Sequence, residues 1–478
     1  MIAIIIIKSI PLIISTIFKH YTYGPPQPSW GLKLHLIVKL ARFLAKNQNL
    51  TLEEVQEHHL TRINRIPPGF KIDKVIINDE FRKSAQTYIE TLLKPYEIVI
   101  DPIWKSPKNK GINGEFLMDK NWDFNNVKND WENEKIILYL HGGAYAAGTI
   151  NIFREFCSQI SKASGARTLA IDYRLAPQQP FPAALCDVLA TYLYLTNPPK
   201  DSGFQPYKPE QIVICGDSSG GGLSVSLGLV LRDLGLPLPA GIVGLSSWFD
   251  LTHSMPSFFD PNMDETDALP PILGFKMVAN PNSFAYSEFK SRTGLIINNI
   301  QEHPEVKLIG DDSLKRIGQA ICYYVVNEGF GIPYVSPMLA ESLGGLPPML
   351  IVTGNAERLR DEAIYLSYRA ANPERYRLPA YENDFDNSRF KSPTSVKLEV
   401  FDEMPHTFQL FPLEQSKLSI QRVGEFISNV IQEAIQAKPC PHKFEALKIS
   451  YHGEVQNLDE SSIEHVLKWD KAGVYPGV

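Results

Sequence analysis

The segment IVICGDSSGG, residues 212–221, decides how the chain is expected to fold. Four apolar residues that suit a buried strand lead into the pattern G-x-S-x-G, and small and apolar residues that suit a helix follow it. In this strand–turn–helix context, small neighbours let a strained turn lift the serine hydroxyl. The spacing therefore predicts Ser218, and not Ser219, as a nucleophile. A glycine-rich turn without chemistry would show the same residues, so the pattern needs support from the rest of the chain.

Outward from this segment, further apolar runs predict the strands of a mostly parallel sheet. Continuous runs separated by helical stretches indicate strands covered by helices on both faces, which is an α/β architecture. The last run, residues 396–400, alternates apolar with charged side chains and is expected to be an edge strand with one wet face. The other runs lie at residues 136–140, 168–171, 242–245 and 349–352, and helices are expected at about 184–196, 219–233, 360–371 and 415–436.

A second motif, HGGAY at residues 141–145, follows the predicted strand IILYL. Glycines directly after a strand leave backbone N–H groups free to point at a developing oxyanion. The N–H of the residue after the nucleophile can join them. The sequence therefore predicts an oxyanion hole formed by Gly142, Gly143, Ala144 and Ser219. The histidine that opens the motif, His141, is expected to order this loop and to take no direct part in chemistry.

The proton acceptor for the serine is expected late in such a chain. His406 lies in MPH, residues 404–406, just past the last strand run, and it is the best placed of the eleven histidines. The segment GNAERLRDE, residues 354–362, follows the preceding strand run and contains three acids. One of them is expected to orient the imidazole, as in a Ser-His-acid triad. Position alone leaves the choice among Glu357, Asp361 and Glu362 open.

With these motifs in place, the chain resembles the hormone-sensitive-lipase-like family of α/β-hydrolases. This is the HGGG esterase and deacetylase group, which includes arylacetamide and steryl ester deacetylases. The resemblance covers about residues 95–436 in the family's order. The matching segments are HGGAY at 141–145, DYRLAP at 172–177, FPAAL at 181–185, GDSSGG at 216–221, SSWFDLT at 246–252, YVSPMLAE at 334–341, GNAERLRDE at 354–362 and MPH at 404–406.

The resemblance implies an α/β-hydrolase fold with a helical cap and a catalytic triad. Family enzymes place the acid three residues after the glycine of the GNAERLRDE segment, which implies Glu357. Most members carry Asp there, so Asp361 stays the alternative. The resemblance also implies that Gly143 and Ala144 supply oxyanion donors, with Ala144 in place of the third glycine of HGGG. The Arg and Asp of DYRLAP are expected to fix a turn at the end of a strand.

These observations predict a serine carboxylic-ester hydrolase that acts through an acyl-enzyme on short-acyl esters of apolar alcohols. Sterol or lipid esters are candidate substrates. Two alternatives stay open: an amide hydrolase or deacetylase with the same triad, and a non-catalytic small-molecule receptor on the same fold. Plant gibberellin receptors resemble this family but lack the catalytic histidine, whereas His406 is present here. No metal or cofactor is implied, and the oligomeric state is left open.

Composition narrows the classes of partner. The 47 basic and 53 acidic residues give a net charge of −6, so no global basic field attracts nucleic acid. A mean hydropathy of −0.14 excludes a polytopic membrane protein. None of the five cysteines forms a pattern typical of a zinc site, and Cys186 and Cys215 are expected to be buried small hydrophobes.

The N-terminus breaks the soluble pattern. Residues 2–18 are mostly apolar, but Lys8 and Pro11 interrupt them. As a helix these 17 residues reach only ~25 Å against a ~30 Å hydrocarbon core. Residues 32–46 follow as an amphipathic stretch in which His35, Lys39, Arg42 and Lys46 form one basic stripe, a pattern typical of a helix at a bilayer surface. Membrane association is therefore expected, with the endoplasmic reticulum as candidate compartment and orientation open. The alternative is that both helices pack on the protein itself.

The expected organisation has four parts. Residues 1–23 form a membrane-associated segment, and residues 24–94 form a linker and cap helices. Residues 95–436 form the catalytic domain, with a cap insertion at 253–335 and a charged surface loop at 374–395. Residues 437–478 form an extension without an assigned role.

Overall fold

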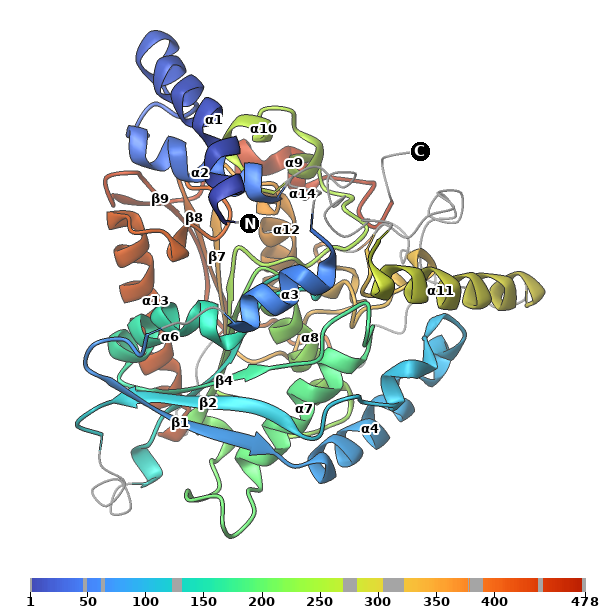
Figure 1. Cartoon of the computed structure of the whole chain (residues 1–478). Coiled ribbons are helices and arrows are strands. Elements are labelled where there is room, and N and C mark those ends of the chain that lie inside the picture. Colours follow the sequence, from blue (N-terminus) through green and yellow to red (C-terminus); the bar gives the residue numbers. More distant parts are fainter. Residues whose placement is uncertain are drawn as a thin grey trace.

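A ten-stranded sheet runs through the described part of the chain (Figure 1). The computed structural model describes residues 2–45, 50–61, 65–122, 131–269, 282–303, 322–376, 378, 390–436 and 442–474. The strand order is β1-β2-β4-β3-β5-β6-β7-β8-β9-β10, parallel from β4 to β9 and antiparallel at both ends. The strands are β1 (Phe70–Ile77), β2 (Ile112–Asp119), β3 (Ile136–Leu140), β4 (Arg167–Asp172), β5 (Ile212–Asp217), β6 (Gly241–Leu245), β7 (Met349–Gly354), β8 (Val396–Phe401), β9 (Phe444–Ile449) and β10 (Val455–Asn457).

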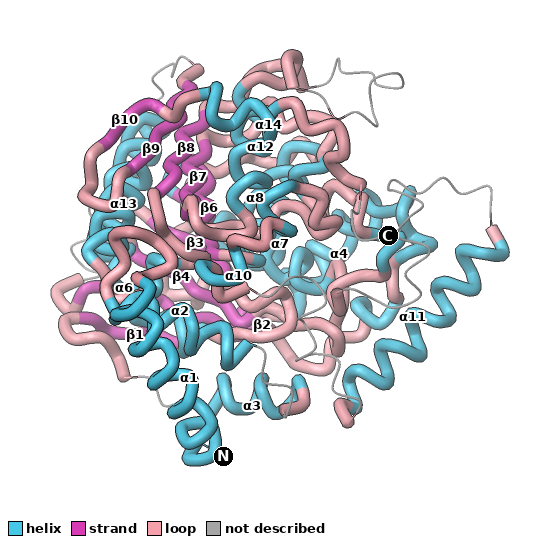
Figure 2. The backbone as a smooth tube through the Cα atoms, turned by 90° about the horizontal axis from the view of Figure 1, so that it is seen from above, coloured by secondary structure: helices cyan, strands magenta, loops and turns pink. Residues whose placement is uncertain are grey.

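Helices cover both faces of this sheet (Figure 2). One face carries α6 and α13, and the other carries α7, α8 and α12, with α4 packed on α7. The helices are α1 (Ile2–Tyr23), α2 (Leu32–Ala45), α3 (Leu52–Thr61), α4 (Asp79–Leu93), α6 (Ile150–Ser164), α7 (Ala183–Thr196), α8 (Ser219–Asp233), α9 (Pro256–Phe259), α10 (Met263–Thr266), α11 (Phe284–Glu302), α12 (Arg360–Ala371), α13 (Glu414–Ile435) and α14 (Glu464–Leu467).

The central strands are buried on both faces, which explains their continuous apolar runs. In β3, Ile136, Leu138 and Leu140 join the core under α7, α8 and α12. Ile137 and Tyr139 alternate with them and join the core under α6 and α13. The predicted α/β architecture with helices on both faces is confirmed.

The expectation that residues 396–400 form an edge strand is wrong. β8 lies inside the sheet, because β9 pairs with it in parallel along its whole length. Glu399 is fully buried, and its Oε1 accepts a 2.9 Å hydrogen bond from Nε of Arg422 on α13. The alternation that suggested a wet face therefore marks an ion pair beneath a helix. A buried carboxylate is tolerated when it has such a partner.

Three regions hold strands that the sequence analysis did not predict. One is the start of the expected catalytic domain, which supplies β2. β1 lies within the region expected to contain only a linker and cap helices, and its antiparallel pairing with β2 extends one end of the sheet. The extension beyond residue 437 supplies β9, β10 and α14, which extend the other end. The expected surface loop at 374–395 and cap insertion at 253–335 lie partly outside the described residues.

The two N-terminal helices form a hairpin, with α1 projecting from the body (Figure 1). The basic stripe of α2 packs against the protein. It is therefore not the face by which α2 would lie on a bilayer. Arg42 is 8% exposed and ion-pairs with Asp264, and Lys39 pairs with Glu265. The acids of the α10 segment therefore hold this side of α2 on the protein. Lys46, the last basic residue of the predicted stripe, lies outside the described residues.

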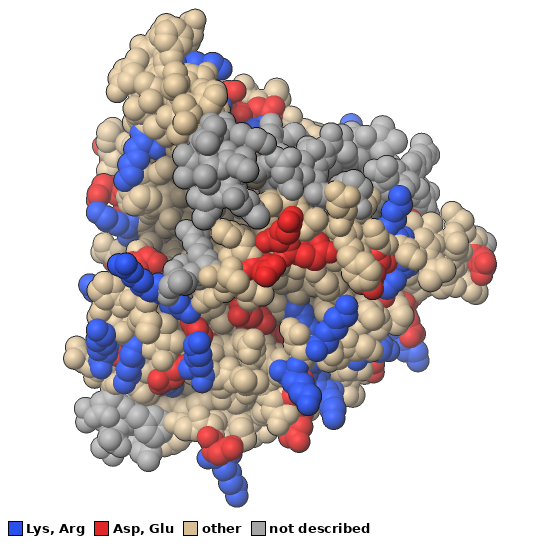
Figure 3. Space-filling view, in the orientation of Figure 1, with Lys and Arg blue, Asp and Glu red and all other residues tan. Residues whose placement is uncertain are grey.

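Helix α1 keeps a large apolar surface. The exposed fractions of Ile14, Phe18 and Tyr21 are 62%, 62% and 75%. Figure 3 shows the projecting end of the hairpin as a mostly uncharged surface. No helix among the described residues combines the length and hydropathy needed to cross a bilayer.

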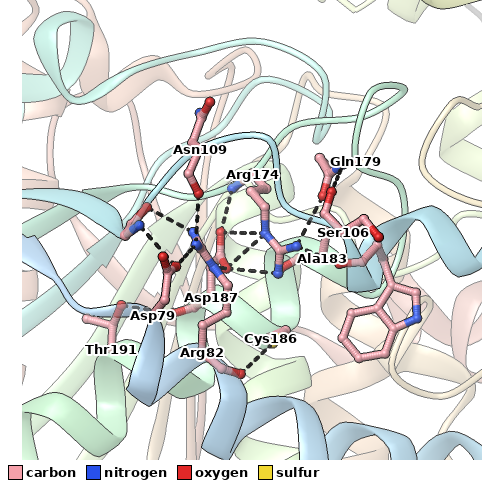
Figure 4. Close-up of polar contacts among 12 residues, drawn as sticks. Asp79, Arg82, Ser106, Asn109, Arg174, Gln179, Ala183, Cys186, Asp187 and Thr191 are labelled. Atoms are coloured by element: carbon pink, nitrogen blue, oxygen red, sulfur yellow. Dashed lines mark hydrogen bonds and ion pairs between the residues drawn. The ribbon is translucent and has the colours of Figure 1, made fainter.

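The DYRLAP segment fixes loops around the sheet, as predicted. Arg174 is buried, and its backbone N–H and Nε donate to the carboxylate of Asp187 at 3.0 Å (Figure 4). Arg82 of α4 donates to the same carboxylate at 2.8 Å. Asp172 accepts the backbone N–H of Ile150, the first residue of α6. These contacts tie β4 to the neighbouring helices and involve no candidate catalytic residue.

Candidate active site

Ser218 occupies the sharp turn between β5 and α8. Its φ of 50° and ψ of −122° place a non-glycine residue in a strained conformation. The turn is possible because its neighbours are glycines: a Cβ on Gly220 would lie 2.0 Å from the carbonyl oxygen of Leu140. The G-x-S-x-G pattern thus reflects the space available at this turn, which presents the Ser218 hydroxyl above the carboxyl ends of the strands.

His406 reaches this hydroxyl from the loop that follows β8. Its Nε2 lies 3.0 Å from Oγ of Ser218, within hydrogen-bond distance. The imidazole is 6% exposed, and burial lowers its pKa to about 3. A neutral imidazole can accept the serine proton, which is the form that a general base needs.

Glu357 lies behind the imidazole, in the loop between β7 and α12. Its Oε2 is 3.8 Å from Nδ1 of His406, and the side chain is fully buried. Burial raises the pKa of Glu357 to about 8, and the nearby charge of Asp267 acts in the same direction. Hydrogen bonds from two hydroxyls oppose this shift, because they stabilise the carboxylate.

The other two candidate acids point elsewhere. Asp361 accepts hydrogen bonds from the backbone N–H of Ser257 and from Nε of Arg360. Glu362 accepts the backbone N–H groups of Phe249 and Asp250. Both acids lie in the first turn of α12 and hold the chain that follows β6. Of the three, Glu357 is the one that the structure brings to His406.

Two hydroxyl residues at this site were missed in the sequence analysis. Ser246 donates to Oε2 of Glu357 at 2.7 Å, and Thr353 donates to Oε1 at 2.5 Å. The Ser246 oxygen also accepts the backbone N–H of Thr407, the residue after His406. The available signal was positional, since Ser246 follows β6 and Thr353 lies near the end of β7, at the sheet edge where the acid was expected.

The HGGAY loop lies beside Ser218, and three of the four predicted donors keep free N–H groups. Those of Gly143, Ala144 and Ser219 have no acceptor among the described residues. The assignment of Gly142 is wrong, because its N–H donates to Oδ1 of Asp217 at 2.8 Å. That bond fixes the loop against the serine turn and leaves nothing to offer an oxyanion.

His141 orders the loop, as predicted. Its ring stacks on Tyr173 at 4.4 Å between centroids, and its Nδ1 lies 2.8 Å from the carbonyl oxygen of Gly142. The ring is 1% exposed, and burial lowers its pKa to about 4. It therefore acts as a neutral, packed spacer under the glycine loop.

A cavity of about 320 Å³ opens onto Ser218 and His406. Its walls are mainly apolar and come from several parts of the chain. Helix α3 contributes from the N-terminal region, and Phe258 and Leu269 come from the predicted cap insertion. Helix α11 of that insertion contacts α3 instead of lining the cavity. The main apolar lining residues are Leu52, Val55, Phe153, Trp248, Phe258, Leu269, Leu359 and Leu410.

Comparisons with known proteins agree with this geometry. Residues 137–277 match a family described by its α/β hydrolase fold. An acetyl-hydrolase of Streptomyces hygroscopicus is 29% identical over 304 residues, which is 63% of this chain and 78% of the relative. An esterase of Acinetobacter venetianus is 24% identical over 299 residues, or 62% of this chain and 75% of the relative.

Solved structures extend the match beyond the sequence comparisons. An esterase from the bacterial hormone-sensitive lipase family aligns with a TM-score of 0.54 and 25% identity, covering 84% of this chain and 99% of that one. An esterase/lipase from an uncultured bacterium aligns with the same TM-score and 26% identity, covering 84% of this chain and all of that one. The chain therefore has an α/β hydrolase fold, resembles esterases of the hormone-sensitive lipase family, and is an enzyme of the serine α/β-hydrolase type.

Proposed function

We propose that the chain hydrolyses carboxylic esters through an acyl-enzyme formed on Ser218. The observation that carries this proposal is the 3.0 Å approach of His406 Nε2 to the Ser218 hydroxyl, at an apolar cavity. The acetyl-hydrolase and esterase among its relatives support the same reaction class.

In this mechanism, Ser218 Oγ attacks the ester carbonyl while His406 takes its proton. Gly143, Ala144 and Ser219 donate their backbone N–H groups to the resulting oxyanion. The imidazolium then gives its proton to the alcohol oxygen as the C–O bond breaks. Water repeats the sequence on the acyl-enzyme, and Glu357 orients the imidazole and stabilises its charged form throughout.

The cavity supports short acyl groups. A volume of about 320 Å³ lies at the small end of the usual range for ligand sites, and Ala144 places a methyl group next to Ser218. The apolar walls favour esters of apolar alcohols. An apolar helix α1 at a membrane surface would place the cavity close to sterol and lipid esters, which are therefore the candidate substrates. Ester and amide hydrolysis need the same catalytic groups. The hydrolysis rates of a p-nitrophenyl ester and of the p-nitroanilide with the same acyl group therefore decide between the two activities.

The test is hydrolysis of p-nitrophenyl acetate by the parent, Ser218→Ala and Ser219→Ala proteins. Ser218→Ala should abolish turnover while the protein stays folded, because one hydroxyl at a turn contributes little to the core. Ser219→Ala should keep most activity, since its contribution is a backbone N–H. Activity that survives Ser218→Ala and disappears in Ser219→Ala would refute the assignment. A parent that binds small apolar molecules without turnover would favour the receptor alternative.

The proposal extends to a membrane surface. The exposed Ile14, Phe18 and Tyr21 of α1 present apolar and aromatic groups of the kind that enter a bilayer interface. The endoplasmic reticulum remains the candidate compartment. Flotation of the parent with lipid vesicles, lost in an Ile14→Glu/Phe18→Glu variant, is the expected result. Equal flotation of both proteins would contradict association through α1.

A further inference from the structure

The loop that carries His406 is attached to the start of the chain. Glu403 precedes His406 on this loop, and its carboxylate accepts two hydrogen bonds from Ser29. The Ser29 backbone N–H donates at 2.9 Å and its hydroxyl at 3.2 Å. The indole N–H of Trp30 donates to the backbone carbonyl of Glu403 at 2.7 Å. Trp30 is 2% exposed, so this contact is shielded from water.

The conformation of Glu403 needs such support. Its φ of 60° lies in the left-handed region, which a non-glycine residue adopts only when surrounding contacts hold it there. The segment from Asp402 to Thr407 has no regular secondary structure. It therefore depends on contacts from other elements to place the imidazole.

Each part of this loop is held by a different element. The backbone N–H of Asp402 donates to Ile449 of β9 at 2.8 Å, and the carbonyl of Met404 accepts the N–H of Ala356 at 3.0 Å. At the far end, Thr407 donates to the Ser246 hydroxyl at 3.0 Å. The contacts at Glu403 come from the segment between α1 and α2, before the sheet begins.

From these contacts we infer that Ser29 and Trp30 are positioning residues for His406. They form a strap that fixes the Glu403 backbone and, through it, the direction in which the imidazole approaches Ser218. This inference rests on the proposed function, since it assigns His406 the role of general base. Misplacement of a catalytic group by about 1 Å can lower a rate by ~10²-fold. Loss of the strap therefore acts mainly on turnover.

The test is Trp30→Phe in the full-length protein. Phenylalanine keeps an aromatic ring at this buried position and removes the indole N–H that donates to the Glu403 carbonyl. We expect kcat for p-nitrophenyl acetate to fall ~5- to 50-fold while KM stays within twofold, because the cavity walls are unchanged. The rate of labelling by a fluorophosphonate should fall by the same factor. Ser29→Ala, which alters a half-buried side chain, should lower kcat in the same direction by a smaller factor.

Trp131→Phe is the matched control. Trp131 is 7% exposed and donates its indole N–H to the carbonyl of Pro206 at 3.1 Å. It precedes β3 and so lies at the amino ends of the parallel strands, whereas Ser218 follows β5 and lies at their carboxyl ends. The control should lower the melting temperature as much as Trp30→Phe does and leave kcat within twofold of the parent.

The outcomes separate the inference from the proposed function. A Trp30→Phe protein whose kcat and labelling rate equal those of Trp131→Phe would overturn the strap, while the proposed function would stand. A loss of kcat that accompanies unfolding in Trp30→Phe, with normal kcat in a folded Ser29→Ala, would also overturn it. A parent protein that neither hydrolyses the ester nor reacts with fluorophosphonate would refute the proposed function itself.

Discussion

Removing the Ser246 hydroxyl should move the pH dependence of hydrolysis. Ser246 is fully buried and donates a 2.7 Å hydrogen bond to Oε2 of Glu357, the oxygen that faces His406. This bond lowers the pKa of Glu357, although burial outweighs it and raises the pKa to about 8. Ser246→Ala therefore raises that pKa further. The carboxylate that orients the imidazole then forms only at higher pH.

The size of the effect follows from the strength of the bond. A hydrogen bond to a charged group contributes about 1.5–3 kcal/mol, and 1.36 kcal/mol corresponds to one pKa unit. An upward shift of about one unit is the minimum expected. With a parent pKa near 8, roughly a tenth of the Glu357 side chains are ionised at pH 7, and roughly a hundredth after such a shift. Activity at pH 7 should fall about tenfold.

The assay is kcat for p-nitrophenyl acetate between pH 6 and pH 10. The rising limb of the parent should move to higher pH in Ser246→Ala, and the ratio of parent to variant kcat should fall as the pH rises toward 10. Any loss that is the same at every pH reports the second bond of the Ser246 hydroxyl, to the N–H of Thr407. Ser226→Ala is the control, because the Ser226 hydroxyl is buried without a partner and lies away from Glu357. A rising limb at the same pH in both proteins would contradict the expected shift in the pKa of Glu357.

Further predictions concern the acid, the oxyanion loop and the N-terminus. Glu357→Gln should lower kcat by ~10³- to 10⁴-fold, as amide replacement of a triad acid does, whereas Asp361→Asn should mainly lower the melting temperature; the reverse pattern would transfer the role to Asp361. Ala144→Gly should keep hydrolysis within a fewfold and shift the preference toward longer acyl chains, which a p-nitrophenyl ester series measures; an unchanged preference would exclude its methyl group as a limit. Deleting residues 1–23 spares the Trp30 strap and should move the protein from membrane to soluble fractions with soluble-ester hydrolysis within a fewfold; recovery as inactive aggregate would show that α1 packs on the body.

Much of the fold could be predicted because the decisive residues act locally. The runs that became β3 and β5 through β7 are buried on both faces, and burial on both faces leaves a continuous apolar signal. The turn at Ser218 needs small neighbours for steric reasons, so its pattern is visible in five residues. The choice of the triad acid could be narrowed to three residues, because all three follow the run that became β7.

What could not be predicted depends on contacts between distant segments. The charge of Glu399 suggested a solvent-exposed face, but its partner Arg422 lies 23 residues later in the chain. The strand that pairs with β8, β9, comes from a tail with no clear sequence pattern. The sequence predicted that the N–H of Gly142 would face the oxyanion, but this N–H donates to the side chain of Asp217, 75 residues later. The basic side of α2 suggested a helix at a bilayer surface, whereas its Lys39 and Arg42 form ion pairs with Glu265 and Asp264 of this same chain.

The most direct test of the central claim is the site of covalent modification in the unaltered protein. A fluorophosphonate reacts with a serine whose hydroxyl is activated by a neighbouring base, and peptide mass spectrometry then locates the adduct. We expect one adduct per chain, on Ser218, and its loss in His406→Ala. An adduct on Ser219 or another serine would show that Ser218 is not the nucleophile, and labelling that persists at the parent rate in His406→Ala would show that His406 is not its base.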